Sequence, residues 1–284
     1  MANTDRMHLV AAALLVLVLL DSCSLLLVHA NFGNDTVASW GAQNVVISPD
    51  GQNLTLTLNN QTGCRIDSIN QFMFGSIEMQ IKLVQGNSAG TVTSYYMSSD
   101  GTHHDEIDFE FLGNSTGQPY VIHTNVFANG TGNREQQFYP WFDPSSSFHN
   151  YTIHWNPSQI VWSIDGTPIR VFRNYENLGV PFPRRQAMKA YSSIWNGEDW
   201  ATQGGRVKID WSSAPFVASY THLGLRACLS SDVQCVSAFP ATNLTSDQQT
   251  AMANIRSSYM MYDYCKDATR FNGVVPLECS QPQN

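Results

Sequence analysis

Three carboxylates alternate with three large apolar side chains in the stretch EIDFEF, residues 106–111. In a β-strand, successive side chains point to opposite faces of the sheet. Glu106, Asp108 and Glu110 would then share one face, with His104 just before them, while the apolar residues form the other face. Like charges along one strand face repel one another, so this row predicts a function rather than a contribution to stability.

Two glutamates with an aspartate between them suit retaining glycoside hydrolysis. At about 3.3 Å per residue, the Cα atoms of Glu106 and Glu110 lie roughly 13 Å apart, and both side chains can lean toward the ~5 to 5.5 Å carboxyl separation of that chemistry. One glutamate attacks the anomeric carbon and the other protonates the leaving oxygen. The shorter Asp108 suits a supporting role, bonding one glutamate and raising the pKa of the other. Spacing alone does not assign the two glutamate roles.

Two other interpretations of this segment are weaker. A calcium or magnesium site is one, with His103, His104, Glu106, Asp108 and Glu110 as the available ligands. A straight strand presents such ligands in a line rather than around a point, so we expect no metal and no other cofactor. A solvated acidic face is the second interpretation, but such a face normally mixes in basic residues, and none occurs between Lys82 and Arg134.

The elements that position these acids are expected to be short strands. From about residue 37 to 212, apolar and polar residues alternate with period two, and turn signals such as Asp165-Gly166 separate the runs. Candidate strands are 54–58, 76–83, 91–97, 104–111, 120–127, 151–155, 160–165 and 206–211. This pattern predicts an all-β fold, an antiparallel sandwich with the acids on its outer, concave face. Asp105 falls on the core side, where it needs hydrogen bonds.

The last part of the chain has a different character. Residues 246–264 predict a helix that begins with a capping box of Ser246 and Gln249 and carries an apolar stripe from Met252 to Tyr262. We therefore expect a catalytic domain over residues 31–220 and a C-terminal extension over residues 221–284.

The N-terminus reads as a secretory signal. Residues 1–30 combine a short polar start, an apolar run from Leu9 to Leu20 and a small-residue cleavage site ending at Ala30. A membrane anchor is the alternative, but the run falls short of the roughly 20 residues that span a bilayer. The net charge of −8 disfavours nucleic acid and anionic membranes as partners. Sequons for N-glycosylation occur at Asn34, Asn53, Asn60, Asn114, Asn129, Asn150 and Asn243, as in exported proteins.

Four cysteines crowd into the C-terminal extension. In an oxidising compartment they predict two disulfides, with three possible connectivities. Pairing neighbours, Cys228 with Cys235 and Cys265 with Cys279, closes the shortest loops and is our expectation. Cys64 stands alone and is expected to be a buried small hydrophobe.

Aromatic residues point to a sugar ligand. The stretch YSSIWNGEDWATQGG, residues 191–205, is expected to be a loop that presents Tyr191, Trp195 and Trp200. Aromatic faces stack on pyranose rings while amide and guanidinium groups bond the hydroxyls.

Together these motifs resemble those of the plant xyloglucan endotransglucosylase/hydrolases, in glycoside hydrolase family 16. The likeness rests on HDEIDFEFLGN at 104–114, HTNVF at 123–127, GNREQQFYPWFDP at 132–144, DGTPIRVF at 165–172, GVPFP at 179–183, NGEDWATQGG at 196–205 and YMMYDYC near the end. It covers nearly the whole chain after the signal. It implies a β-jelly-roll with a concave substrate cleft and a small disulfide-bonded C-terminal extension containing a helix, with the cysteine pairing given above.

The resemblance also assigns roles. It implies that Glu106 is the nucleophile, Glu110 the acid/base and Asp108 the helper between them, and that Asn114 is glycosylated. Sugar contacts are implied for His123, Thr124, Asn125, Asn133, Arg134, Glu135, Asp199, Trp200, Gly204 and Arg270. His123 departs from the glutamine that many relatives carry there.

The implied activity is retaining cleavage of the β-1,4-glucan backbone of xyloglucan and transfer to a xyloglucan or oligosaccharide acceptor. We expect a secreted monomer in the cell wall and apoplast that builds and remodels the wall. A predominantly hydrolytic xyloglucanase and a non-catalytic glycan-binding lectin are the alternatives.

Overall fold

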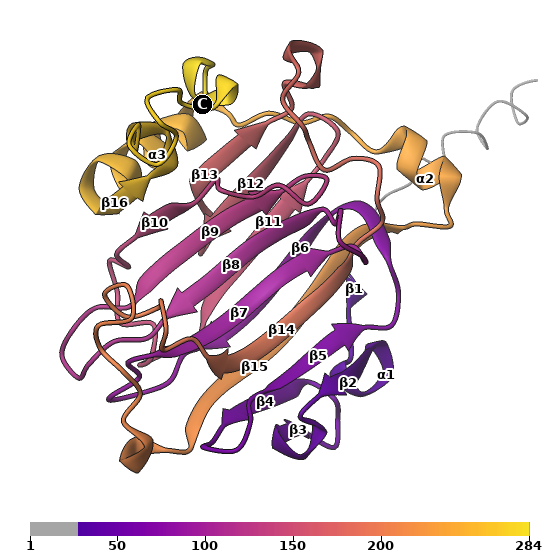
Figure 1. Cartoon of the computed structure of the whole chain (residues 1–284). Helices are drawn as coiled ribbons and strands as arrows, with labels where there is room; N and C mark the ends of the chain where they lie inside the picture. Colours follow the sequence, from indigo (N-terminus) through magenta and orange to yellow (C-terminus); the bar gives the residue numbers. More distant parts are fainter. Residues whose placement is uncertain (1–27, 284) are drawn as a thin grey trace, which may run out of the picture.

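Two antiparallel sheets of eight strands each make up most of the chain. The computed structural model describes residues 28–283, so the expected signal peptide, residues 1–30, lies almost wholly outside the described residues. Figure 1 shows the two sheets packed face to face, with the N-terminal strands at one end and the C-terminal helix α3 at the opposite end. The predicted antiparallel sandwich is confirmed. No helix in the described range is long and apolar enough to cross a bilayer.

The cleft sheet is the one that carries the acids. Its strand order is β16, β10, β9, β8, β7, β14, β5, β2, with the bounds Met260–Asp263, Gln136–Phe138, Val121–Phe127, Glu106–Leu112, Thr91–Ser98, Lys189–Asn196, Cys64–Ser68 and Thr36–Trp40. The back sheet runs in the order β13, β12, β11, β6, β15, β4, β3, and β1 pairs with β15. Those bounds are Thr167–Arg173, Gln159–Ile164, His149–Trp155, Phe72–Lys82, Phe216–Leu229, Asn53–Leu58, Val45–Ile47 and Val28–His29.

Helices are few. The α-helices are α1 (Phe32–Asp35), α2 (Val233–Ala238) and α3 (Ser246–Tyr259). Short 3-10 turns are η1 (Ala42–Asn44), η2 (Glu176–Leu178), η3 (Trp211–Ser213), η4 (Tyr264–Lys266) and η5 (Leu277–Ser280). Met252 of α3 packs against Val161 and Val171 on the outer face of the back sheet.

The core explains why β8 presents its acids to solvent. Ile107, Phe109 and Phe111 are fully buried between the sheets. Tyr151 of the back sheet meets both phenylalanines edge to face, with ring centroids 5.6 and 4.6 Å away. Since burial of these three residues fixes one face of β8, the alternating acids must occupy the other.

Asp105 lies on the buried side, as predicted, and its polar groups are satisfied there. Its side chain is almost inaccessible, and its Oδ1 accepts a hydrogen bond from the backbone N–H of Asn129 at 2.8 Å. Its own N–H donates to Ser99 Oγ at 2.8 Å. Burial raises the pKa of this carboxyl.

The predicted strand at residues 206–211 is wrong. This segment forms turns and extended coil that lead into η3. Ile209 is still buried between exposed neighbours, so the alternation reflects real burial. Its backbone N–H donates to the Glu198 carboxylate at 3.2 Å, and Asp210 caps η3. Side chains, rather than a neighbouring strand, satisfy the backbone here.

The predicted C-terminal helix begins at Ser246 as expected but is shorter, and its N-cap lies one residue before the predicted one. Thr245 is the N-cap, and it forms the capping box with Gln248 rather than Ser246 with Gln249. The helix ends at Tyr259, and Tyr262 lies on β16, which pairs with β10 at the edge of the cleft sheet. The apolar pattern continued past the helix because the strand also buries one face.

Both predicted disulfides are present, Cys228–Cys235 and Cys265–Cys279. The first joins the end of β15 to α2, and the second joins η4 to η5. The expected boundary at residues 220 and 221 falls inside β15, which continues to Leu229, so the sandwich and the extension share this strand. Cys64 is fully buried, as predicted, and burial raises the pKa of its thiol to about 11.

Candidate active site

The acid row lies on the floor of a cleft across the cleft sheet. On β7, Ser98, Tyr96 and Ser94 pair with the three acids in turn; on β9, the partners are Phe127, Asn125 and His123. The register therefore gathers polar and aromatic side chains from several strands around Glu106, Asp108 and Glu110. The cleft has a volume of about 440 Å³ and is lined by Ser94, Tyr96, Glu106, Asp108, Glu110, His123, Asn125, Phe127, Glu135, Ser193, Trp195 and Trp200.

Asp108 is the most deeply buried of the three acids. Burial, followed by the charges of Glu106 and Glu110, raises its pKa well above the ordinary value. Its carboxyl is hydrogen-bonded to Glu106, a bond that raises the pKa of Asp108 and lowers that of Glu106. Both effects favour a proton on Asp108 that is shared with Glu106.

Glu106 and Glu110 occupy different environments. Burial raises the pKa of Glu106, but Ser98, His104 and Asp108 each oppose that rise, and His104 Nε2 lies 4.0 Å from Glu106 Oε2. For Glu110, burial and the charges of Glu106 and Glu135 all act in one direction and raise its pKa to about 7. The two glutamates thus differ: three neighbours oppose the rise in the pKa of Glu106, whereas the causes acting on Glu110 all favour its protonated form in mildly acidic solution.

One end of the cleft, at Glu135, is bordered by the C-terminal extension. Arg270 Nη1 lies 2.7 Å from Glu135 Oε2, and its Nη2 donates to Asn133 Oδ1 at 2.8 Å. The hydroxyl of Tyr262 accepts from Arg270 at 3.1 Å. Asn133 has φ +64°, a conformation that asparagine tolerates better than most residues. The structure thus brings Arg270 to two implied sugar contacts, Asn133 and Glu135, that lie 137 and 135 positions earlier in the sequence.

Two implied sugar contacts lie beneath the cleft instead. Thr124 points toward the core, where its Oγ1 donates to the Gln136 backbone and accepts from Arg170. The Arg134 side chain is buried and pairs with Glu278 at 2.7 Å. These residues support the cleft rather than line it.

The loop after β14 holds the remaining implied contacts. Trp200 lines the cleft, with its ring centroid 5.9 Å from that of His123. Asp199 is almost fully exposed and pairs with Lys208 at 3.2 Å. Gly204 sits at an exposed turn with φ +68°. Tyr191 and Trp195, expected on this loop, lie on β14, so that expectation is wrong for these two residues.

Several cleft residues escaped the site prediction. Tyr96, Ser94 and Ser193 line the cleft, and the two serine hydroxyls are 2.6 Å apart. Alternation along residues 91–97 placed Ser94 and Tyr96 on one face, but only the pairing of β7 with β8 shows that this face is also the face of the acids. Among residues 28–283, no group of three or more His, Cys, Asp or Glu side chains is arranged to hold a metal ion.

The family comparison agrees with this geometry. The model of "Glycosyl hydrolases family 16" matches residues 32–213, and that of the "Xyloglucan endo-transglycosylase (XET) C-terminus" matches residues 234–279. The chain belongs to glycosyl hydrolase family 16. As a member of that family it is an enzyme that acts by a retaining glycosidase mechanism.

Relatives cover this family 16 enzyme almost end to end. It is 47% identical over 272 residues to xyloglucan endotransglucosylase protein 1 of Diospyros kaki, covering 95% of each chain. It is 49% identical over 283 residues to the probable xyloglucan endotransglucosylase/hydrolase protein 23 of Arabidopsis thaliana, covering 96% of this chain and 99% of the relative.

Solved structures of the same sandwich are also similar. Bacillus licheniformis β-glucanase is 25% identical with a TM-score of 0.53, and the match covers 70% of this chain and 90% of that one. The Crh5 transglycosylase is 26% identical with a TM-score of 0.54, covering 68% of this chain and 78% of the other.

Proposed function

We propose that this family 16 enzyme is a xyloglucan endotransglucosylase that cuts the β-1,4-glucan backbone of xyloglucan with retention and transfers the new end to a xyloglucan acceptor. The single observation that carries the proposal is the contrast between Glu106 and Glu110 on one strand, in a cleft that the C-terminal extension borders. The relatives are named for xyloglucan, which supports the choice of polysaccharide.

The first half of the reaction forms a glycosyl-enzyme. Glu106, kept ionised by Asp108 and His104, attacks the anomeric carbon, and the C1–O4 bond breaks. Glu110 carries a proton up to about pH 7 and delivers it to the departing 4-oxygen. Asp108 positions the nucleophile through its hydrogen bond and moves no proton to substrate.

The second half transfers the sugar. Glu110, now a carboxylate, removes the proton from an acceptor 4-hydroxyl, which attacks C1 and releases Glu106. Transfer exceeds hydrolysis only if the cleft holds an acceptor in attack geometry, and a barrier difference of about 1.4 kcal/mol changes the partition tenfold. Hydrogen-bond donors and acceptors for such a sugar are available at the end of the cleft next to the extension, on Asn133, Glu135 and Arg270. Trp200 supplies a stacking face.

The expected surroundings of the enzyme belong to this proposal. We place it outside the cell, in the cell wall and apoplast, as a monomer that carries a glycan at Asn114 and requires no cofactor. Two disulfides and the number of sequons support export. Asn114 is half-buried just after β8, and its Nδ2 donates to the Pro119 backbone at 3.0 Å.

The deciding experiment measures whether a labelled acceptor is joined to the polysaccharide. The purified enzyme is incubated with xyloglucan in the presence and absence of a labelled xyloglucan oligosaccharide, next to Glu106→Gln as the inactive control. Label entering the polymer supports transfer. New reducing ends without incorporation replace the proposal with hydrolysis, and binding without any turnover replaces it with a lectin.

A further inference from the structure

A buried guanidinium lies under the catalytic face with no carboxylate bonded to it. Arg170 of β13 is only 1% exposed, among the most deeply buried large side chains of the described chain. Its Nη1 donates to the backbone oxygen and to Oγ1 of Thr124, both at 2.8 Å, and its Nη2 donates to the Arg134 backbone oxygen at 2.5 Å. Each of these acceptors is neutral, and no carboxylate in residues 28–283 lies within ion-pair distance of Arg170.

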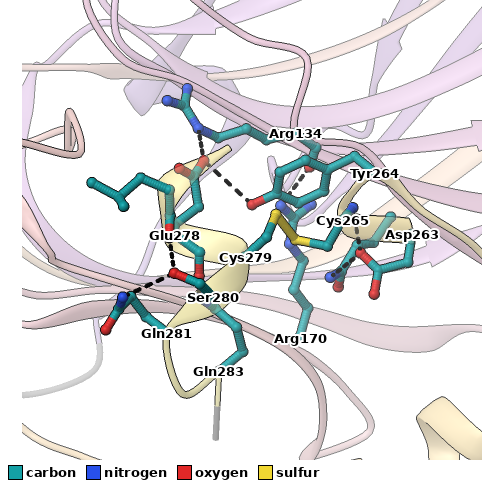
Figure 2. Close-up of a disulfide and its surroundings, with 12 residues drawn as sticks. Arg134, Arg170, Asp263, Tyr264, Cys265, Glu278, Cys279, Ser280, Gln281 and Gln283 are labelled. Carbon is teal, nitrogen blue, oxygen red and sulfur yellow. Dashed lines mark hydrogen bonds and ion pairs between the residues drawn. A yellow bond between two sulfur atoms is a disulfide. The ribbon is translucent and has the colours of Figure 1, made fainter. Parts of the chain in front are cut away.

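The neighbouring charges are already paired. Figure 2 shows the Arg170 guanidinium beside the Cys265–Cys279 disulfide, reaching toward the Arg134 backbone, while the Arg134 side chain pairs with Glu278 at 2.7 Å. Asp263 has a counter-ion of its own in Arg256, at 3.5 Å. The charge of Arg170 is therefore locally uncompensated, a costly arrangement in a protein interior.

Arg170 is linked to the acid row through one aromatic side chain. Arg170 stacks on Trp162, with its guanidinium carbon 4.7 Å from the ring centroid. The indole N–H of Trp162 donates to the backbone oxygen of Asp108 at 2.9 Å. Thr124, which accepts hydrogen bonds from Arg170, lies between His123 and Asn125 on β9. Arg170 is therefore held directly beneath the strands that form the cleft floor.

We propose that Arg170 is a positioning residue for the reaction given above: its buried positive charge stabilises the ionised nucleophile through the sheet, and its hydrogen bonds hold β9 and the Asn133–Glu135 segment in place. In the low-dielectric interior such a charge acts over longer distances than in water. The charge of Arg170 lowers the pKa of Asp108. It also lowers the pKa of His123, where burial and Glu135 have larger effects.

Other ionisable groups share this environment and enter the interpretation. Those that interact with Arg170 are Tyr264, Asp263, Arg256 and Glu135. Those that face the acid row are His104, His123, Glu135, Tyr96 and Arg65. None of them is changed by the variants below, so a displaced pH profile reports the charge of residue 170.

The test compares charge with shape. Arg170→Met and Arg170→Gln remove the charge, and the glutamine keeps an N–H donor for the Thr124 backbone; Arg170→Lys keeps the charge. The acidic limb of kcat/KM against pH should move upward by roughly 0.5 to 1 unit in the first two variants and return to the wild-type position in Arg170→Lys. Arg173→Gln, three positions along the same strand, is the matched control and should leave the profile unmoved.

A second readout does not depend on turnover of xyloglucan. Carbon-13 NMR of carboxyl-labelled protein follows the titration of the cleft acids in wild type and variants, with Trp162→Phe as a control that loses the bond to Asp108 but no charge. Higher midpoints in Arg170→Gln than in Arg170→Lys support the proposal even if the polysaccharide assignment fails. Equal midpoints and unmoved pH limbs, with only lower unfolding temperatures, overturn it; if Arg170→Met does not fold, the glutamine and lysine pair decides.

Discussion

His123 faces Glu110 across the β8–β9 pair, with its Nε2 3.8 Å from Glu110 Oε2. The other ring nitrogen, Nδ1, lies 2.9 Å from the amide nitrogen of Gln137, which can only donate. Nδ1 is therefore the acceptor, and the ring proton is on Nε2, aimed at the acid/base. Burial lowers the pKa of His123 to about 4, so the ring is neutral at mildly acidic pH.

This arrangement predicts that His123 works as a neutral donor. His123→Gln keeps an N–H donor and should retain activity within about threefold. His123→Leu should lower kcat/KM by roughly ten- to a hundredfold, because it removes the polar group that faces Glu110 and leaves the Gln137 amide without its partner. Steady-state kinetics of the two variants measure this. Equal damage in both would show instead that the imidazole itself, or its charge, is required.

The pH profile should fall on the alkaline side near pH 7. Glu110 must be protonated to act as the acid, and its raised pKa of about 7 means that the proton is lost as the pH rises through that value. Transfer rates measured from pH 4 to 9 at saturating donor define the alkaline limb of the pH profile. A rate that stays level up to pH 9 would exclude Glu110 as the acid.

The same raised pKa has a consequence for stability. The folded-state pKa of Glu110 lies above its ordinary value of 4.5, so its favourable contribution is complete below pH 4.5 and is lost as the pH rises through about 7. At about 1.36 kcal/mol per unit, the loss is at most roughly 3 kcal/mol. Glu110→Gln should flatten the fall in unfolding temperature between pH 5 and 8. An unchanged slope would mean that the other two acids carry this dependence.

Acceptor binding should depend on the extension. Arg270→Ala removes the contacts to Glu135 and Asn133 and should raise the KM for the oligosaccharide acceptor about tenfold, with little effect on donor cleavage, so that hydrolysis gains over transfer. Titrations with labelled acceptor measure transfer, and reducing-end assays measure hydrolysis. The control is Arg185→Ala, whose side chain is 84% exposed. If both variants behave as wild type, the acceptor does not bind at the end of the cleft next to Arg270.

The sequence predicted the catalytic strand because burial of one face fixes the other. Ile107, Phe109 and Phe111 had to enter the core, so the acids that alternate with them had to face the opposite side of the sheet. The hairpin with Asp165-Gly166 at its turn was predictable for a similar local reason, and β12 and β13 flank it.

Alternation alone could not distinguish a strand from coil that buries every second residue. Residues 206–211 alternate, yet the carboxylate of Glu198 replaces a strand partner. Trp195 was predicted to lie on a loop because asparagine and glycine follow it, but it lies on β14, which ends at Asn196. The pairing of Arg270 with Glu135 joins residues far apart in the chain and was not predicted, since spacing carries no information on it and the family resemblance implied the two residues only as sugar contacts.

The packing beneath the acids should be the most sensitive part of the sandwich. Phe111 is fully buried against Phe109 and Tyr151, with ring centroids 5.9 and 4.6 Å away, so Phe111→Ala should destabilise the protein by about 3 to 5 kcal/mol. Phe148→Ala is the matched control, since that ring is 39% exposed. Denaturant unfolding of both variants measures the difference. Because Phe111 lies next to Glu110 on the same strand, activity should fall at temperatures below the unfolding midpoint of Phe111→Ala; a loss of stability with full activity up to that midpoint would show that the acids are positioned by their cross-strand partners rather than by the core.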